Sequence, residues 1–240
     1  MTKLILGDCL DVMKDISDNS IDLLFCDLPY GQTTCKWDCV IDLESFWKEV
    51  NRICREKCPM FFTCSTKFGV SLINSNPKCF RYDLVWIKSA SCGFLNAKKM
   101  PMKKHEMVYV FYRKLPFYNL SSHKHKLLKE RKTTDYKNES FIYGKIDRPD
   151  HMRKNGESSY DPPLPNTILE IKSEKGKHAT QKPVELIKWI LKYYSKEGDN
   201  VLDPTMGSGT TGIACKEMKR KFIGIEKDKK IFKIAEERIL

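Results

Sequence analysis

The segment Val201–Gly212 (VLDPTMGSGTTG) constrains the fold more than any other part of the sequence. An apolar run ends at Asp203-Pro204, a glycine-rich turn follows, and a helix is predicted over Thr210–Met218. In such a strand–loop–helix unit, glycines let the backbone approach a ligand and the helix N–H groups face it. Because this unit starts at residue 201 of 240, its sheet must be completed by strands from the beginning of the chain.

Alternating strands and helices predict an α/β domain with a largely parallel central sheet. Short apolar runs indicate buried strands, and apolar residues at helical spacing indicate helices. The predicted strands are 3–6, 21–26, 59–64, 82–87, 107–112, 167–171 and 222–226, and the predicted helices are 9–16, 43–54, 183–194, 210–218 and 229–239.

Residues 113–165 interrupt this pattern. Between 113 and 154, twelve Lys and Arg stand against five Asp and Glu, and three prolines follow within 160–165. We therefore predict one domain made of residues 1–112 and 166–240, with 113–165 inserted into it. A charge run alone is more often a solvated surface than a binding site. The formal net charge of +12 nevertheless indicates a polyanionic partner.

The ten cysteines are scattered, and several lie in apolar runs, which favours reduced thiols in a cytoplasmic protein over a disulfide framework. The pairs Cys35/Cys39 and Cys54/Cys58 lack the usual zinc spacing, so no metal site is predicted. Neither a secretory signal nor a long apolar segment is recognised, so no membrane association is expected.

The glycine loop differs from a P-loop, because Thr210 stands where the phosphate-binding lysine would be. Asp203 at the strand end would repel phosphate and attract a cationic or hydrogen-bond-donating ligand. Glu226 ends the next strand at the spacing typical of an acid that binds ribose hydroxyls. A tight turn with two solvated acids is the alternative, which the flanking strands disfavour.

The tetrapeptide Asp27-Leu28-Pro29-Tyr30 follows a buried strand. A carboxylate can accept a hydrogen bond from an exocyclic amine, a proline fixes the direction of a neighbouring carbonyl, and a tyrosine ring can stack on a flipped base. Two acceptors on the amine hydrogens restore a lone pair on nitrogen for attack on an electrophilic methyl group. Taken alone, the tetrapeptide is more typical of a strand-end turn with a partly buried tyrosine.

Together these motifs resemble the S-adenosylmethionine-dependent DNA amino-methyltransferases of the beta group, in which the catalytic tetrapeptide precedes the cofactor motif. Leu6–Cys9 (LGDC) resembles the family's segment near the cofactor adenine, although Asp8 is also typical of a helix N-cap. His178–Pro183 (HATQKP) resembles a cofactor-side motif, and His105-Glu106 matches a recurrent element. The cofactor contacts that the resemblance implies are Asp8, Cys9, Thr180, Gln181, Lys182, Asp203, Thr205, Gly207, Ser208, Gly209, Thr210 and Glu226.

The resemblance implies a circularly permuted, Rossmann-like methyltransferase fold with 113–165 as the target-recognition region. It also implies methyl transfer from S-adenosylmethionine to adenine N6 of a flipped-out base in double-stranded DNA. Asp27, Leu28 and Pro29 would polarise the amine, and Tyr30 would stack on the base. The family usually has proline at the position of Leu28, and because that position mainly contributes backbone, activity is expected to survive.

Three alternatives stay open from the sequence. A cytosine-N4 methyltransferase would use the same pocket, although Asp27 favours adenine. A catalytically silent DNA-binding subunit is conceivable because of Leu28, and a nicotinamide-dependent oxidoreductase would leave 27–30 without a role. The resemblance also raises a homodimer and a cognate restriction endonuclease as protein partners.

Overall fold

The computed structural model describes residues 1–31, 40–130, 139–140, 144–145, 156–174 and 181–240. The chain forms two compact units, unit 1 (Met1–Asn119 and Thr167–Leu240) and unit 2 (Leu120–Asn166). Within these described ranges, no helix is long and apolar enough to span a membrane.

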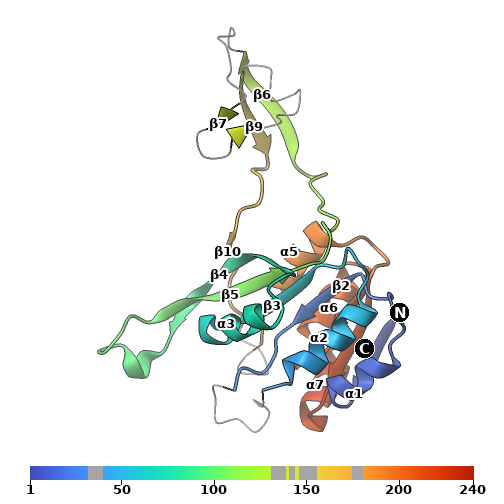
Figure 1. Ribbon diagram of the computed structural model, residues 1–240. Helices are drawn as coiled ribbons and strands as arrows, with labels where there is room; N and C mark the ends of the chain where they lie inside the picture. Colours follow the sequence, from blue (N-terminus) through green and yellow to red (C-terminus); the bar gives the residue numbers. More distant parts are fainter. Residues whose placement is uncertain (32–39, 131–138, 141–143, 146–155, 175–180) are drawn as a thin grey trace. The chain divides into compact units, whose positions relative to one another are not determined.

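Unit 1 is built on an eight-stranded sheet in the order β1-β12-β11-β2-β3-β5-β4-β10 (Figure 1). The strands are β1 (Thr2–Leu6), β2 (Leu23–Cys26), β3 (Met60–Cys64), β4 (Phe80–Cys92), β5 (Lys103–Phe111), β10 (Ile168–Glu170), β11 (Asn200–Asp203) and β12 (Lys221–Glu226). β5 runs antiparallel to both its neighbours, and all other neighbouring pairs are parallel. The prediction of a largely parallel sheet is confirmed.

In this sheet, two strands from the C-terminal part of the chain lie between two strands from its N-terminal part. β12 pairs with β1 on one side and β11 on the other, and β11 pairs with β2. The strand before the glycine loop therefore lies directly beside the strand before the tetrapeptide. The late position of the glycine unit required such an arrangement, and the two motifs meet at the same carboxyl edge.

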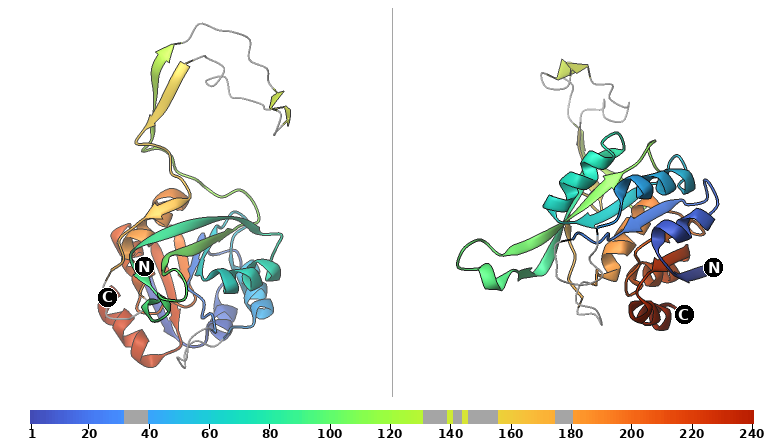
Figure 2. Two further views of the ribbon diagram at one scale, coloured as in Figure 1. Left: turned by 90° about the vertical axis from the view of Figure 1, so that its left-hand side faces the viewer. Right: turned by 60° about the horizontal axis from the view of Figure 1, so that its bottom comes forward.

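Helices cover both faces of the sheet (Figure 2). One face carries α1 (Cys9–Val12), the 3-10 helix η1 (Met13–Asp15), α2 (Leu43–Ile53) and α3 (Thr66–Ser75), and the other carries α5 (Val184–Tyr194), α6 (Thr210–Glu217) and α7 (Lys229–Ile239). α2 begins at the N-cap Asp42 and buries Phe46, Trp47, Val50 and Ile53. These side chains lie at helical spacing, which explains why the helix could be predicted.

Helix α3 was not predicted from the sequence. Its buried face consists of Phe68, Gly69 and Leu72, too few residues for a clear apolar stripe. A Cβ atom at Gly69 would lie 2.0 Å from the Tyr109 ring, so the helix packs closely on β5. Tertiary packing against the sheet, rather than local periodicity, defines this helix.

The β4–β5 hairpin extends beyond the sheet (Figure 1). β3 ends at Cys64, which lies level with Val85 through β5, while β4 continues to Cys92. Because β4 is parallel to β3, the hairpin projects from the carboxyl edge. Its end includes the 3-10 helix η2 (Phe94–Asn96), in which Phe94 and Leu95 are 82% and 97% exposed. The four lysines Lys98, Lys99, Lys103 and Lys104 are exposed around them.

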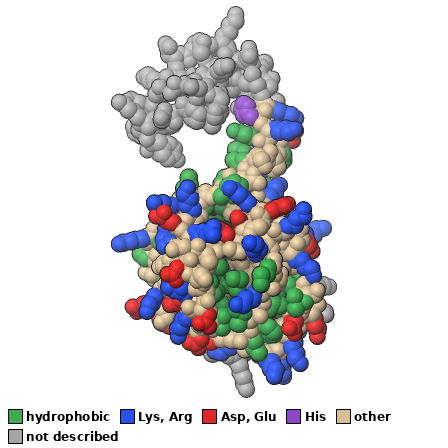
Figure 3. Space-filling model, turned by 90° about the vertical axis from the view of Figure 1, so that its right-hand side faces the viewer, with side chains coloured by type: hydrophobic (Ala, Val, Ile, Leu, Met, Phe, Trp, Pro, Cys, Tyr) green, Lys and Arg blue, Asp and Glu red, His purple; other side chains and the backbone are tan. Residues whose placement is uncertain are grey.

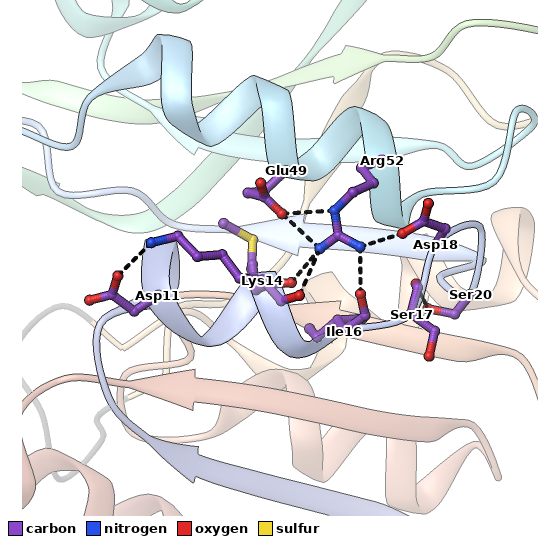
Figure 4. Close-up of polar contacts among 9 residues, drawn as sticks. Asp11, Lys14, Ile16, Ser17, Asp18, Ser20, Glu49 and Arg52 are labelled. Atoms are coloured by element: carbon purple, nitrogen blue, oxygen red, sulfur yellow. Dashed lines mark hydrogen bonds and ion pairs between the residues drawn. The ribbon is translucent and has the colours of Figure 1, made fainter.

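At the amino edge, Arg52 ties α2 to the α1–η1 segment (Figure 4). Its guanidinium donates to the Glu49 carboxylate at 2.7 and 2.9 Å and to Asp18 Oδ1 at 2.5 Å. It also donates to the carbonyls of Met13 and Ile16 at 2.7 and 2.8 Å. The Met13 carbonyl also accepts the Ile16 N–H at 3.1 Å, so Arg52 is its second donor, whereas a carbonyl just past a helix end, such as that of Ile16, has no partner within the helix. One side chain therefore satisfies the end of η1 from a neighbouring element.

Unit 2 contains two antiparallel strand pairs. β6 (Lys124–Glu130) pairs with β9 (Gly156–Asp161), and β7 (Glu139–Ser140) pairs with β8 (Gly144–Lys145). Lys126 Nζ lies 2.5 Å from Asp161 Oδ2 across the first pair. The sequence predicted no strands here, because the apolar periodicity is weak and the pairing depends on cross-strand contacts. Residues 113–119 belong to unit 1.

Candidate active site

A cavity of about 430 Å³ lies at the carboxyl edge of the unit 1 sheet. The segments that follow β1, β2, β11 and β12 form its walls, together with the residues before α5. The predicted site residues that line it are Asp8, Cys9, Asp27, Pro29, Gln181, Lys182, Thr205, Gly207, Ser208, Thr210 and Glu226. Leu28, Tyr30, Asp203 and Gly209 lie beside it without lining it, and Thr180 falls outside the described residues.

The glycine loop is held in shape by its own backbone and by helix α7. Gly207 and Gly209 have φ values of +52° and +84°, in the left-handed region that favours glycine. A Cβ atom at Gly209 would lie 2.6 Å from Ile239 Cδ1, so α6 starts in contact with α7. From α7, Arg238 donates to the Ser208 carbonyl at 2.5 Å and to Ser208 Oγ at 2.8 Å.

Asp203 stabilises this loop through two hydrogen bonds. Its Oδ1 accepts the Thr205 N–H at 3.1 Å, and its Oδ2 accepts the Thr211 hydroxyl at 2.5 Å. The side chain is 3% exposed, and burial raises the pKa of the carboxyl to about 7. The sequence predicted Asp203 as a direct cofactor contact, whereas the structure turns its carboxylate toward the loop.

Two acids at neighbouring strand ends face the cavity. Asp8 accepts the Leu10 N–H at 3.0 Å as the N-cap of α1, and its second oxygen lies 3.3 Å from Lys227 Nζ. It is therefore both a cap and a cavity residue, so the two interpretations of Asp8 do not exclude each other. Glu226 accepts the Gly207 N–H at 3.1 Å and the Asp228 N–H at 2.7 Å. Burial raises the pKa of Glu226 above its ordinary value.

Cys9 lines the same wall as a buried thiol. Burial, followed by the neighbouring Asp8 carboxylate, raises its pKa to about 12. A thiol of that pKa stays protonated at neutral pH and is a poor nucleophile. Cys9 therefore contributes packing to the cavity rather than covalent chemistry.

Asp27 is the centre of a polar network at the end of β2. Its Oδ1 accepts the Tyr30 hydroxyl at 2.7 Å and the Thr63 hydroxyl at 2.5 Å. Its Oδ2 accepts Lys182 Nζ at 2.6 Å. Thr63 comes from β3 and Lys182 from the segment before α5, so three parts of the chain fix the position of this carboxylate.

Glu106 on β5 extends the network away from Asp27. Its Oε1 lies 3.2 Å from Lys182 Nζ, and its Oε2 lies 2.6 Å from Lys88 Nζ. Burial raises the pKa of Glu106, but the two lysines outweigh burial and leave it below its ordinary value. Burial lowers the pKa of Lys182, but the nearby carboxylates of Asp27 and Glu106 outweigh burial and leave the pKa of Lys182 above its ordinary value. Both shifts favour the charged forms, so Glu106 and Lys182 form a buried ion pair.

Tyr30 is held at both ends. Its single hydroxyl proton is shared between Asp27 Oδ1 at 2.7 Å and the Thr63 carbonyl at 2.8 Å, with Glu106 Oε1 at 3.4 Å. Its ring stacks on Phe68 with 5.3 Å between centroids. Burial raises the pKa of the phenol strongly, so it stays a donor. Leu28, at the position where the resemblance predicted a proline, is 3% exposed and packs in the hydrophobic core.

Thr205 joins the two motifs directly. Its hydroxyl donates to the Asp27 carbonyl at 3.1 Å and lies 3.3 Å from Cys26 Sγ. Because Thr205 belongs to the glycine loop, the tetrapeptide and the loop form one wall.

The sequence did not indicate the roles of Thr63, Phe68 and Lys88. Thr63 is a polar residue in the otherwise apolar run 59–64, a signal that could have marked it. Lys88 and Phe68 carry no comparable signal, since their partners lie on other elements. Glu106 was noted as part of the His105-Glu106 element, without a role of its own.

Comparison with known proteins places this architecture among methyltransferases. A family model described as DNA methylase (N6_N4_Mtase) matches residues 21–237. The Type II methyltransferase M2.LlaDCHI of Lactococcus lactis subsp. cremoris is 51% identical over 73 residues, 30% of this chain and 27% of that protein's length. The DNA adenine methyltransferase YhdJ of Escherichia coli (strain K12) is 29% identical over 244 residues, 97% of this chain and 81% of that protein.

The fold is also found in solved structures. A crystal structure of the M1.HpyAVI–SAM complex superposes with a TM-score of 0.64 at 23% identity, covering 99% of this chain and 100% of that one. This likeness concerns the fold, and it agrees with the predicted Rossmann-like methyltransferase architecture.

Proposed function

Because this chain belongs to the DNA methylase family, we propose that it transfers a methyl group from S-adenosylmethionine to N6 of adenine in double-stranded DNA. One observation carries the proposal. Asp27 and Pro29 line the same cavity of about 430 Å³ as Gly207 and Glu226. An acceptor for an exocyclic amine thus lies in the same cavity as a pocket suited to a nucleoside cofactor. A methyl group could pass directly from the cofactor to the amine.

S-adenosylmethionine is the methyl donor of this family, and the cavity fits it. The acids Asp8, Glu226 and Asp228 face a ligand that carries positive charge and ribose hydroxyls, while Ile41 and Ile231 provide apolar walls. When bound, the cofactor supplies the electrophilic methyl group of its sulfonium. Glu226 would hold the ribose, and Asp8 would lie toward the adenine.

The tetrapeptide would act on the target base. Asp27 would accept one hydrogen of the N6 amine, and a backbone carbonyl of Leu28 or Pro29 would accept the other, which returns a lone pair to nitrogen. Nitrogen becomes positive as its bond to the methyl carbon forms, and the Asp27 carboxylate stabilises that charge. The same carboxylate is the base in contact with the N–H that must then be lost. Tyr30 would pack against the flipped base.

Charge supports DNA as the substrate. On the face of unit 1 drawn in Figure 3, Lys and Arg are interspersed with Asp and Glu, so that face carries no patch of one sign. The excess of positive charge lies in residues 113–154 and on the β4–β5 hairpin, whose exposed lysines project from the edge that holds Asp27. Lysines there would contact phosphates, and 113–165 would read the sequence.

Adenine is the proposed target because Asp27 stands first in the tetrapeptide and because YhdJ, which matches 97% of this chain, is an adenine methyltransferase. We further propose a cytoplasmic enzyme that serves a restriction–modification system, with a cognate endonuclease and a second copy of the chain as partners. M2.LlaDCHI, a Type II methyltransferase, supports that setting.

Radiolabelled methyl transfer tests the function directly. The purified chain would be incubated with S-adenosylmethionine carrying a labelled methyl group and with unmethylated DNA of mixed sequence. The DNA would then be digested to nucleosides and separated. Label in N6-methyl-2′-deoxyadenosine is expected, and Asp27→Ala serves as the inactive control. Label in N4-methyl-2′-deoxycytidine would show that the target is cytosine instead of adenine, and no label with bound cofactor would indicate a silent DNA-binding subunit.

A further inference from the structure

The catalytic carboxylate is already engaged by the chain's own side chains. Asp27 Oδ1 carries two donors, Tyr30 and Thr63, whereas Oδ2 carries one, Lys182 at 2.6 Å. The single Tyr30 proton is shared with the Thr63 carbonyl, but the two hydroxyl oxygens, at 2.7 and 2.5 Å, occupy both lone-pair positions of Oδ1. An amine that binds Asp27 must therefore use Oδ2, the oxygen that Lys182 holds.

An ammonium group on Oδ2 opposes the proposed chemistry in two ways. It withdraws electron density from the oxygen that must accept the N–H of the base, which weakens that hydrogen bond. It also places a positive charge beside a nitrogen that becomes positive during methyl transfer. Both effects are strong in a buried site, and the Lys182 side chain is 10% exposed.

Glu106 offers Lys182 a second acceptor. Lys182 Nζ is 3.2 Å from Glu106 Oε1, longer than its contact with Asp27 and within ion-pair distance. Glu106 is 8% exposed and is fixed at its other oxygen by Lys88 at 2.6 Å. Because the Lys182 ammonium is within ion-pair distance of both carboxylates, it can pass from Asp27 to Glu106 without becoming an unpaired buried charge.

We propose that Lys182 is a positioning residue that holds the Asp27 carboxylate before the target base enters and moves onto Glu106 when the amine takes Oδ2. Tyr30 and Thr63 keep Oδ1 in place during this exchange. Lys182 was predicted from sequence as a cofactor contact, and this inference gives it a role toward the base instead. The inference rests on the proposed methyl transfer to an exocyclic amine.

Glu106 variants provide the test, because Glu106 does not line the cavity and its two short contacts are with Lys182 and Lys88. Its longer contact with the Tyr30 hydroxyl, at 3.4 Å, is controlled by a double-variant cycle. Glu106→Gln removes the second acceptor, and Glu106→Asp keeps the charge but withdraws it by one methylene, so a folded protein is expected for at least the latter. For both, kcat with unmethylated mixed-sequence DNA is expected to fall about tenfold, with the Kd for S-adenosylmethionine within twofold of wild type by calorimetry. Glu185→Gln, which alters a surface pair with Lys188, is the matched control and should leave kcat unchanged.

A double-variant cycle separates this role from a merely structural one. In a Lys182→Met background, Glu106→Gln is expected to change kcat less than twofold or to restore part of the kcat lost by Lys182→Met. The reason is that Glu106 no longer has an ammonium group from residue 182 to accept. A further tenfold loss there, or an unchanged kcat in both Glu106 single variants, would overturn the inference. So would a loss of cofactor affinity in Lys182→Met as large as its loss of kcat. Absence of methyl transfer by the wild-type chain would instead overturn the proposed function, and the inference with it.

Discussion

Two charged clusters lie at opposite edges of the same sheet and differ in what surrounds them. At the amino edge, Arg52 binds Glu49, Asp18 and the carbonyls at the end of η1, all of them permanent parts of the fold (Figure 4). At the carboxyl edge, Asp27 and Lys182 both line a cavity, and Lys182 has two competing acceptors.

This difference predicts that the Arg52 cluster contributes mainly to folding stability and the Asp27 cluster mainly to catalysis. Every donor of the Arg52 cluster meets an acceptor that no ligand displaces, so removing it should weaken folding. The Asp27 cluster presents an oxygen to a cavity, so removing it should stop chemistry while its remaining charges stay paired. The following changes test this contrast, from the largest expected effect to the smallest.

Asp27→Ala is expected to lower methyl transfer by about three orders of magnitude, as is typical for loss of a group that acts on the reacting atom. Lys182 would still pair with Glu106 at 3.2 Å, so no buried ammonium is left alone and the Tm should stay within a few degrees. Turnover assays and thermal unfolding measure both. A variant with full turnover, or one that is inactive because it is unfolded, would break the contrast.

Arg52→Ala is expected to lower the free energy of unfolding by about 2 kcal/mol, since the Ile16 carbonyl and the carboxylates of Asp18 and Glu49 lose the donor that Arg52 supplies. This corresponds to a fall in Tm of about 6 °C for a chain of this size. Below that temperature kcat should be unchanged. Arg55→Ala is the matched control at the same edge, because the Arg55 side chain is 54% exposed and its partners among the described residues are the Asn19 carbonyl and Asp22. The Tm of this variant should change little.

Asp203→Asn probes the acid beneath the glycine loop. Its pKa is raised to about 7, so between roughly pH 4 and 7 the folded state keeps a proton that the unfolded chain has released. This carboxyl therefore makes the free energy of unfolding fall as pH rises, by about 1 kcal/mol per unit. The variant lacks this slope, so relative to it the wild type should lose stability across that window. Urea unfolding at several pH values measures the difference, and parallel curves would contradict the raised pKa.

Asp8 variants separate its cap from its proposed contact with the cofactor. Asp8→Ala removes both and should cost about 1 kcal/mol of stability as well as cofactor affinity. Asp8→Asn keeps a capping side chain but loses the charge, so its stability should stay near wild type while the Kd for S-adenosylmethionine rises roughly threefold. Calorimetry and thermal unfolding distinguish the two. Equal affinity in Asp8→Asn and wild type would leave Asp8 as a cap alone.

The sequence predicted the family, the α/β class and the two motifs, because each depends on residues close together in the chain. Apolar runs mark β2 and β11, glycines mark the turn after β11, and acids at strand ends follow them directly. Helix α7 was predicted with its observed bounds, Lys229–Ile239, since its apolar residues recur at helical spacing.

The tertiary structure alone decided which side chains meet these motifs. Lys182 reaches Asp27 from 155 residues away, and Thr63 reaches it from a neighbouring strand. The contacts of Lys182 and Thr63 depend on the order of strands in the sheet, which local periodicity does not encode. Asp203 instead bonds Thr205 and Thr211 within its own strand–loop–helix unit, and the sequence did not indicate that orientation of its side chain. The sequence by itself therefore identified the acceptor for the amine, and only the fold placed a lysine on it.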